Sequence, residues 1–313
     1  MKTTFEKARE FMYRNARPLD LARFQYHFEN GSKEMVMRVL SYYQNEDGGF
    51  GNAVEADCWN PNSIPLHSNT ASDVIREIDF EDADHPVIQG LLNWYAGGKH
   101  FNGKSWEMTV ESNNDYPHAP WWQADSISSC HTDYNGTAQI AGFIARYAQK
   151  DSDLFGLGVR VANEAVSALL DEEITDMHTC VCYMRMAELF ERGKATEYIP
   201  FDKLKESLHK SINKLIDTDT SNWSSYACKP SSFIGSRESE YYKDNKDVAE
   251  YECEYILNTQ LEDGSWNIPW GWADYPEEWA VSKVWWKGHG IVQNLLYLKG
   301  FGKLPVTACY DKH

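Results

Sequence analysis

Hydrophobic residues recur at intervals of three and four along much of the chain, which is the spacing of an amphipathic helix with one buried face. The spacing is clearest in Leu204, Leu208, Ile212 and Leu215, in Ile140, Ala141, Ile144, Ala145 and Ala148, and in Ile291, Leu295 and Leu298. Less regular versions cover 5–15, 19–28, 34–44, 69–79, 86–97, 153–170, 177–192 and 240–259. No useful run alternates β-branched and polar residues as a strand would. The pattern therefore predicts an all-α protein.

The segments between these helices predict how they pair. We expect helix ends at Gly193 and Gly300, because glycine tolerates the left-handed conformation that ends a helix. Short turns alternate with long aromatic loops, which is typical of stacked helical hairpins. No Pro-rich, Gly-rich or low-complexity linker interrupts the chain, so we expect a single domain over residues 1–313.

One short motif occurs twice. Gln44-Asn45-Glu46-Asp47-Gly48-Gly49-Phe50 matches Gln260-Leu261-Glu262-Asp263-Gly264-Ser265-Trp266, and each follows a predicted helix. Fainter versions are Asn102–Trp106 and Thr220–Trp223. An acidic residue and a glycine favour a tight turn, the glutamine amide can bond backbone groups, and the final aromatic ring can pack on a neighbouring hairpin. We interpret the motif as structural, repeating about once per hairpin.

The motif resembles the repeat of the terpenoid cyclase and protein prenyltransferase superfamily, which includes squalene-hopene cyclases and prenyltransferase β-subunits. The resemblance implies an α/α toroid, a ring of about 11 to 12 helices around a central cavity. It also implies an isoprenoid substrate. The Asp-x-Asp-Asp cluster with which such cyclases protonate substrates does not occur here, and neither does the Asp-Asp-x-x-Asp magnesium motif.

Composition narrows the classes of partner. The formal net charge is -17, which repels nucleic acids and anionic lipid surfaces, so we expect no nucleic-acid partner. The first residues lack the apolar core of a signal peptide, and no later stretch reaches membrane-spanning length. Seven irregularly spaced cysteines favour free thiols. These features predict a cytoplasmic protein with no membrane span. They leave its oligomeric state open.

Two groups of residues have the composition of a metal site. The resemblance to prenyltransferase β-subunits implies zinc ligands at Asp57, Cys58 and His289, although Asp57 and Cys58 lack the intervening residue of that pattern. His178, Cys180 and Cys182 form the second group, but on a helix Cys180 points away from the other two. Because zinc needs a defined ligand geometry, we expect core packing in both places, and neither a metal nor a cofactor.

The loop and helix entry over 51–73 combine two acids with aromatic and polar residues. Glu55 and Asp57 are candidate catalytic acid and base, because burial can separate the pKa values of two carboxyl groups. We expect substrate contacts from Trp59, Asn62, His67 and Asn69. The alternative is equally open: Asn60 to Ser63 form an ordinary turn and the acids cap helices.

Two further stretches have a similar composition. The first places an acid and a histidine before paired tryptophans and leads to a third catalytic candidate, Asp133. Its predicted substrate-binding residues are Asp115, Tyr116, His118, Trp121 and Trp122. The second follows the last motif and contributes Trp270 and Trp272. We expect the three stretches to meet at one mouth of the ring.

Three functions remain open, and the resemblance favours the first of them. An enzyme related to terpenoid cyclases or prenyltransferases would use aromatic faces to stabilise carbocations. A carbohydrate-active enzyme would place two carboxylates beside a glycosidic bond and stack sugars on tryptophan. A binding protein would keep the scaffold without catalysis, because one fold hosts unrelated activities. In each case the partner is a small molecule, an isoprenoid or a sugar in the two enzyme hypotheses.

Overall fold

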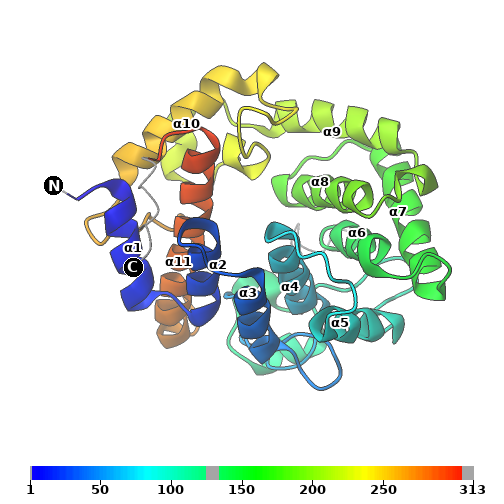
Figure 1. Ribbon diagram of the computed structural model, residues 1–313. Coiled ribbons are helices and arrows are strands. Elements are labelled where there is room, and N and C mark those ends of the chain that lie inside the picture. Colours follow the sequence, from blue (N-terminus) through cyan, green and yellow to red (C-terminus); the bar gives the residue numbers. More distant parts are fainter. Residues whose placement is uncertain (1, 125–133, 305–313) are drawn as a thin grey trace. The chain divides into compact units, whose positions relative to one another are not determined.

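The computed structural model describes residues 2–124 and 134–304 (Figure 1). Over these residues the chain forms eleven α-helices, several short 3-10 helices and no β-strand, with three isolated bridges. The α-helices are α1 (Thr4–Asn15), α2 (Pro18–Phe28), α3 (Lys33–Leu40), α4 (Pro65–Glu77), α5 (Pro86–Ala96), α6 (Thr137–Tyr147), α7 (Asp153–Asp171), α8 (Met177–Arg192), α9 (Phe201–Leu215), α10 (Lys246–Thr259) and α11 (Pro276–Gly300). The all-α prediction is confirmed.

The chain forms two compact units. One, here the terminal unit, combines Met1–Val39 with Ile216–His313, and the other, the central unit, is Leu40–Leu215. The ring of hairpins and the single domain stay predictions. None of the helices in the described ranges is long and apolar enough to cross a membrane.

Helix α6 forms the middle of the central unit (Figure 1), where it packs on α4, α5, α7 and α8. Ten of its eleven residues are buried. Small residues at these positions allow close helix approach: a Cβ at Gly142 would lie 2.9 Å from the Cα of Met186 on α8. Helix α9 covers α7 and α8. The apolar face predicted over Leu204 to Leu215 is buried at Leu204, Leu208 and Ile212.

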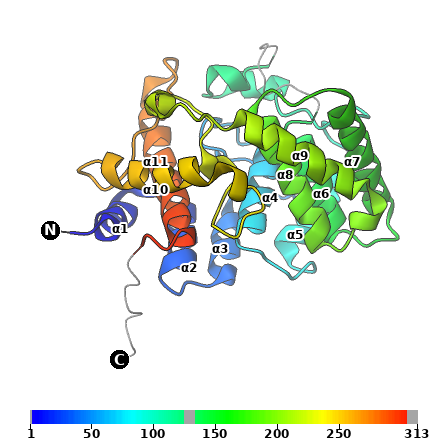
Figure 2. The same ribbon diagram turned by 90° about the horizontal axis from the view of Figure 1, so that it is seen from above.

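Helix α11 is the long helix of the terminal unit and packs against α1, α2 and α10. Figure 2 shows α10 crossing it. The hydrophobic spacing predicted only the part around Ile291 to Leu298. The helix begins fifteen residues before Ile291, at Pro276. Two of the buried positions in its earlier part are Ser282 and Gly288, small residues that a hydrophobic pattern does not reveal.

Several predicted helix ends need correction. Helix α8 does end at Gly193, but the residue with positive φ is Lys194, at 51°. Gly193 serves close packing instead, because a Cβ there would lie 2.7 Å from the Cα of Arg146. Helix α4 begins at Pro65, four residues before the predicted start, since proline suits the first helical position. Helix α10 begins at Lys246 rather than 240.

The first motif segment, Gln44–Phe50, lies in the central unit against α5. The side-chain amide of Gln44 donates to the carbonyl oxygens of Gly48 at 2.8 Å and Val87 at 2.9 Å. Val87 lies in the first turn of α5. Gly48 has φ of 88°, and a Cβ there would lie 2.2 Å from the carbonyl oxygen of Gly90 on the same helix.

The second segment, Gln260–Trp266, makes the same contacts in the terminal unit. Gln260 donates to the carbonyl oxygens of Gly264 at 3.0 Å and Thr4 at 2.9 Å, and Thr4 is the first residue of α1. Gly264 has φ of 92°, and a Cβ there would lie 2.2 Å from the carbonyl oxygen of Lys7. In each segment, a tight turn is therefore hydrogen-bonded to, and packed against, the first turns of another helix.

None of the five cysteines within the described ranges forms a disulfide: Cys58, Cys180, Cys182, Cys228 and Cys253. Cys182 accepts a hydrogen bond from the backbone N–H of Gly136 at 3.1 Å, and burial raises its pKa to about 11. A thiol of this kind stays protonated at neutral pH, which suits the core packing predicted for it.

Candidate functional site

The loop from Gly51 to Ile64 carries the candidate acids, and backbone contacts fix both its ends. The N–H of Gly51 donates to the carbonyl of Tyr43 at 3.1 Å, and that of Ile64 donates to Phe50 at 3.1 Å. Asn45, from the first motif segment, donates to the carbonyl of Pro61 at 3.0 Å. The motif therefore braces the loop that follows it.

Asn60 anchors the middle of the loop and is fully buried. Its side-chain amide nitrogen donates to Ser112 Oγ and to Asn113 Oδ1, both at 2.9 Å. Its Oδ1 accepts from the backbone and side-chain nitrogens of Asn62 at 3.0 and 2.9 Å. Asn113 in turn donates to the carbonyl of Trp122 at 2.9 Å. This asparagine, which the sequence assigned only to a turn, joins two long loops.

The same two loops pair through their backbones directly beside the acids. The N–H of Trp59 donates to the carbonyl of Pro117, and that of Ala119 donates to Asp57, both at 2.8 Å. Cys58 and His118 lie opposite each other in an antiparallel bridge. Two of the three stretches predicted to meet therefore do so within the central unit.

Glu55 and Asp57 are both buried in this loop, with exposed fractions of 7% and 3%. The backbone N–H of Asp57 donates to Oε2 of Glu55 at 2.9 Å, which fixes one carboxylate against the backbone that carries the other. Burial, followed by the nearby carboxylates of Glu55 and Asp57, raises the pKa of the Cys58 thiol far above its usual value. The charges of both acids therefore influence the same buried thiol, and Cys58 is not a thiolate.

Two imidazole rings adjoin the loop from Gly51 to Ile64, here called the acid loop. The backbone N–H of Glu55 donates to Nδ1 of the buried His67 at 3.4 Å. Nδ1 of His118 lies 2.6 Å from the carbonyl oxygen of Tyr116, and because a carbonyl only accepts, this Nδ1 carries a proton. The two rings therefore differ: Nδ1 is an acceptor in His67 and a donor in His118.

An apolar patch borders the same loop. Cys58, Ile64, Leu66 and Val110 form a buried cluster, and the half-buried ring of Trp122 packs against it. The other predicted contacts of these loops are less buried: Trp59, Tyr116 and Trp121 are half-buried, and Asn62 and Asp115 are exposed. The site thus combines two buried acids, imidazoles, amides and an indole face.

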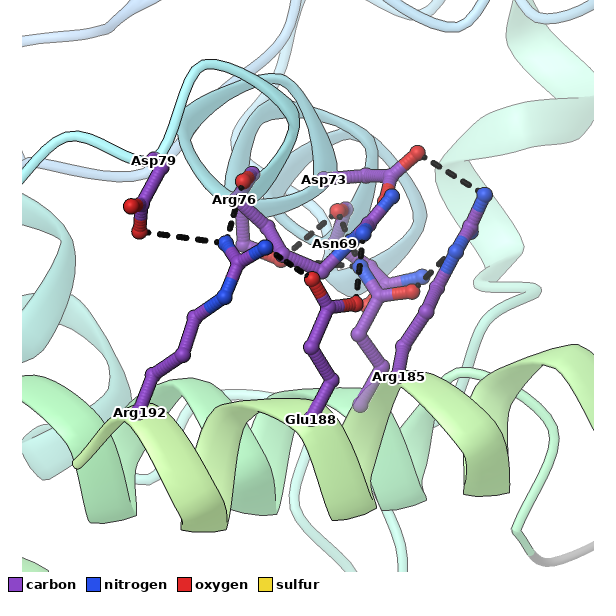
Figure 3. A network of polar contacts seen from close by, with 9 residues as sticks. Asn69, Asp73, Arg76, Asp79, Arg185, Glu188 and Arg192 are labelled. Carbon is purple, nitrogen blue, oxygen red and sulfur yellow. Dashed lines mark hydrogen bonds and ion pairs between the residues drawn. The ribbon is translucent and has the colours of Figure 1, made fainter. Parts of the chain in front are cut away.

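Asn69 does not belong to this group. Residues two apart on a helix point in nearly opposite directions, so Asn69 lies on the other side of α4 from His67. Figure 3 shows it within a polar network between α4 and α8. Its backbone carbonyl accepts from Gln139 of α6 at 3.1 Å. The structure therefore places Asn69 apart from His67, and its predicted role in substrate binding stays a prediction.

The network itself consists of ion pairs (Figure 3). Arg76 bonds Asp73 at 2.8 Å and Glu188 at 2.7 Å, and Arg185 reaches Asp73 at 3.0 Å. Burial raises the pKa of Asp73, but the guanidinium groups of Arg185 and Arg76 outweigh it, so that the pKa lies below its usual range. Arg192 extends the network to Asp79 at 3.1 Å. These partners satisfy one another, so we assign the network to helix packing.

The remaining predicted residues lie elsewhere. Trp270 and Trp272 belong to the terminal unit, where Trp270 contacts the rings of Tyr226 and Trp286 edge to face and Trp272 packs on Trp279. Asp133 lies outside the described residues.

Over residues 2–124 and 134–304, no group of three or more His, Cys, Asp or Glu side chains could hold a metal ion. His289, the third zinc ligand that the resemblance implied, lies in the terminal unit, where its Nδ1 is 3.1 Å from Arg23 Nη1.

Comparison of the chain with protein-family models, with curated proteins and with solved structures finds no match.

Proposed function

We propose that this chain is an enzyme that acts on an uncharged small molecule by proton transfer, with the carboxyl groups of Glu55 and Asp57 as acid and base. One observation carries the proposal: two carboxyl groups two residues apart are both nearly inaccessible to water on a loop that hydrogen bonds hold rigid. Carboxyl groups are common general acids and bases, so two of them on one loop could supply both the proton donor and the proton acceptor.

The charge of the protein supports an uncharged substrate. The chain has a formal net charge of -17, and both candidate catalytic groups are acids. A diphosphate would have to enter against this field. The argument favours a neutral isoprenoid or a neutral sugar over an isoprenoid diphosphate.

A sugar is the better supported of the two substrates. The loop that carries the acids is bonded through the amide of Asn60 to the hydroxyl of Ser112 and the amide of Asn113, and its backbone contacts the imidazole of His67. Indole rings from Trp59, Trp121 and Trp122 belong to the same paired loops. Sugar recognition combines hydrogen bonds to hydroxyl groups with stacking on aromatic rings. The proposed reaction is therefore cleavage or elimination at a glycosidic bond.

An isoprenoid is the second candidate, and a specific contact favours it. The apolar cluster of Cys58, Ile64, Leu66 and Val110 lies against Trp122 beside the acid loop. A carboxylic acid next to such a surface could protonate a hydrocarbon whose cation the indole face stabilises. The resemblance of the two motif segments to the cyclase repeat points the same way.

The experiment compares turnover of two substrate panels. The purified full chain is incubated with neutral oligosaccharides and with neutral isoprenoids such as squalene, and products are identified by mass spectrometry. For the productive substrate, Asp57→Asn and Glu55→Gln should each lower turnover by roughly 10²- to 10⁴-fold, the usual contribution of a general acid or base. Asp84→Asn, an exposed aspartate of the same unit, is the matched control and should leave turnover unchanged.

Melting temperatures separate catalysis from folding. Asp57→Asn should keep the melting temperature of the parent nearly intact, because the amide has almost the same size and shape as the carboxyl group. Full turnover by both acid variants would overturn the assignment of the acids. Saturable ligand binding with no product would establish the binding-protein alternative instead.

A further inference from the structure

Asn60 of the acid loop is a buried amide whose hydrogen-bonding capacity is fully used. Its Nδ2 donates to Ser112 Oγ and Asn113 Oδ1, and its Oδ1 accepts from the backbone and side-chain nitrogens of Asn62. An asparagine side chain has two donor and two acceptor positions, so all four are occupied. A reversed amide would set its NH₂ group against the donors of Asn62. Only one orientation of Asn60 therefore fits.

Asn113 continues these hydrogen bonds to Trp122. It is fully buried, its Oδ1 accepts from Asn60 at 2.9 Å, and its Nδ2 donates to the carbonyl oxygen of Trp122 at 2.9 Å. Asn62, Asn60 and Asn113 thus form a chain in which each side-chain amide donates to the next group, here called the amide relay. Hydrogen bonds aligned in one direction polarise and strengthen one another in a buried site.

The amide relay ends on a residue whose backbone is held on both sides. The N–H of Trp122 donates to the carbonyl of Ala119, and the N–H of Ala119 donates to the carbonyl of Asp57, both at 2.8 Å. The carbonyl of Trp122 accepts from Asn113. Two paths of hydrogen bonds therefore connect the acid loop with Trp122. The first uses backbone groups alone, whereas the second depends on side chains that a substitution can remove.

We propose that Asn60 and Asn113 are positioning residues, which hold the indole of Trp122 in a fixed relation to the carboxyl groups of Glu55 and Asp57. The inference rests on the proposed function, in which the substrate lies on this indole while the acids act on it. Neither amide needs to contact the substrate. A displacement of about 1 Å between a bound substrate and its catalytic groups can lower turnover roughly 100-fold, so the alignment matters for rate.

Turnover of the productive substrate by the full chain tests this role. Asn60→Ala and Asn113→Ala should each lower kcat by roughly 10- to 100-fold and change KM by less than about threefold, because the acids and the indole remain but lose their alignment. The double variant should fall no further than the more impaired single variant, since both substitutions interrupt one relay. Unchanged kcat in both single variants would overturn the proposal, and so would effects that multiply in the double variant.

Asn163 of α7 supplies the matched control. Its side-chain amide donates to the carbonyl of Tyr198 at 2.9 Å, so it also joins two elements of the central unit. Asn163→Ala should leave kcat and KM unchanged when turnover is measured well below the melting temperature. An equal fall of kcat in Asn163→Ala would show a general loss of rigidity and would contradict a specific positioning role for the amide relay.

A spectroscopic measurement separates the amide relay from the proposed function. The full chain is labelled with 5-fluorotryptophan, and the ¹⁹F resonance that disappears in Trp122→Phe is assigned to Trp122. Asn60→Ala should shift or broaden this resonance. The resonance of Trp223, which packs on Tyr251 and Tyr255, is assigned in the same way and should stay unchanged. An unchanged Trp122 resonance would overturn the proposal. A changed resonance in a protein without turnover would support the relay and refute the proposed function alone.

A third measurement needs no variant. In the parent protein, the side-chain amide protons of Asn60 and Asn113 should exchange with solvent at least roughly 100-fold more slowly than those of the exposed Asn267, because they are buried and hydrogen-bonded. NMR measures these exchange rates directly. Equal rates at the three residues would overturn the proposal even if Asn60→Ala and Asn113→Ala failed to fold.

Discussion

At the scale of single residues, burial separates groups that the sequence alone treats alike. Glu55, Asp57 and Asp115 are all acids in aromatic loops, yet the first two are buried and Asp115 is exposed. Asn60 looked like a turn residue and proves to be the buried link between two loops. The candidate acids were predictable from their neighbours. The role of Asn60 as a link could not be predicted, because its partners Ser112 and Asn113 lie more than fifty residues away in the sequence.

The buried aromatic ring that ends the second motif segment gives a prediction at this scale. Trp266 is buried, and its indole N–H donates to the carbonyl of Ile256 at 2.8 Å. Trp266→Ala should lower the free energy of unfolding by roughly 3–5 kcal/mol, because it removes a large buried side chain. Denaturant unfolding measures the change. Trp266→Phe keeps most of the ring and should lose less, so equal losses in both variants would contradict the packing role.

At the scale of elements, the sequence predicted helices well where one face is apolar, as in α9. It missed most of α11, whose early turns bury small residues. The predicted start of α4 also came too late along the sequence. His67 and Ser68, in its first turn, are polar and yet buried, so they do not fit a hydrophobic pattern. Hydrophobic spacing cannot reveal a helix face that is buried by small or hydrogen-bonded side chains.

The glycine of the second motif segment tests how that segment packs. Gly264→Ala places a Cβ 2.2 Å from the carbonyl oxygen of Lys7. Gly103→Ala is the matched control, because Gly103 has a similar φ of 97° and no atom within 4 Å of the new Cβ. Both variants lose the conformational freedom of glycine. Gly264→Ala should be less stable than this control by roughly 1–3 kcal/mol, measured by denaturant unfolding, since it also overpacks. Equal losses of unfolding free energy in the two variants would show that the close contact of Gly264 with Lys7 does not affect stability.

The ion pairs between α4 and α8 give a second prediction for elements. The Arg76 side chain is 17% exposed and bridges Asp73 and Glu188. Arg76→Met leaves both acids with fewer partners and should lower the free energy of unfolding by about 2–3 kcal/mol, somewhat less than for a fully buried pair. Lys210→Met removes an exposed pair with Glu206 on α9 and should change it by under about 0.5 kcal/mol. Similar small changes in both would show that the network contributes little to stability.

At the scale of the whole molecule, the two compact all-α units contain different polar features. The central unit holds the acid loop, and in the terminal unit the buried carboxylate of Glu252 accepts hydrogen bonds from Ser231. The resemblance of the motif implied a ring with one central cavity. The contacts of Gln44 and Gln260 explain the motif locally, since each glutamine bonds its own turn to the first turn of a helix elsewhere in the same unit. The ring stays a prediction.

The central claim is that Glu55 and Asp57 contact the substrate, and a crystal structure of Asp57→Asn soaked separately with neutral oligosaccharides and a neutral isoprenoid tests it most directly. The account predicts a ligand within hydrogen-bond reach of residue 57 and Glu55, with a sugar ring or hydrocarbon chain on the indole of Trp122. A ligand bound elsewhere, with both acid positions bonded only to protein groups, would contradict the claim.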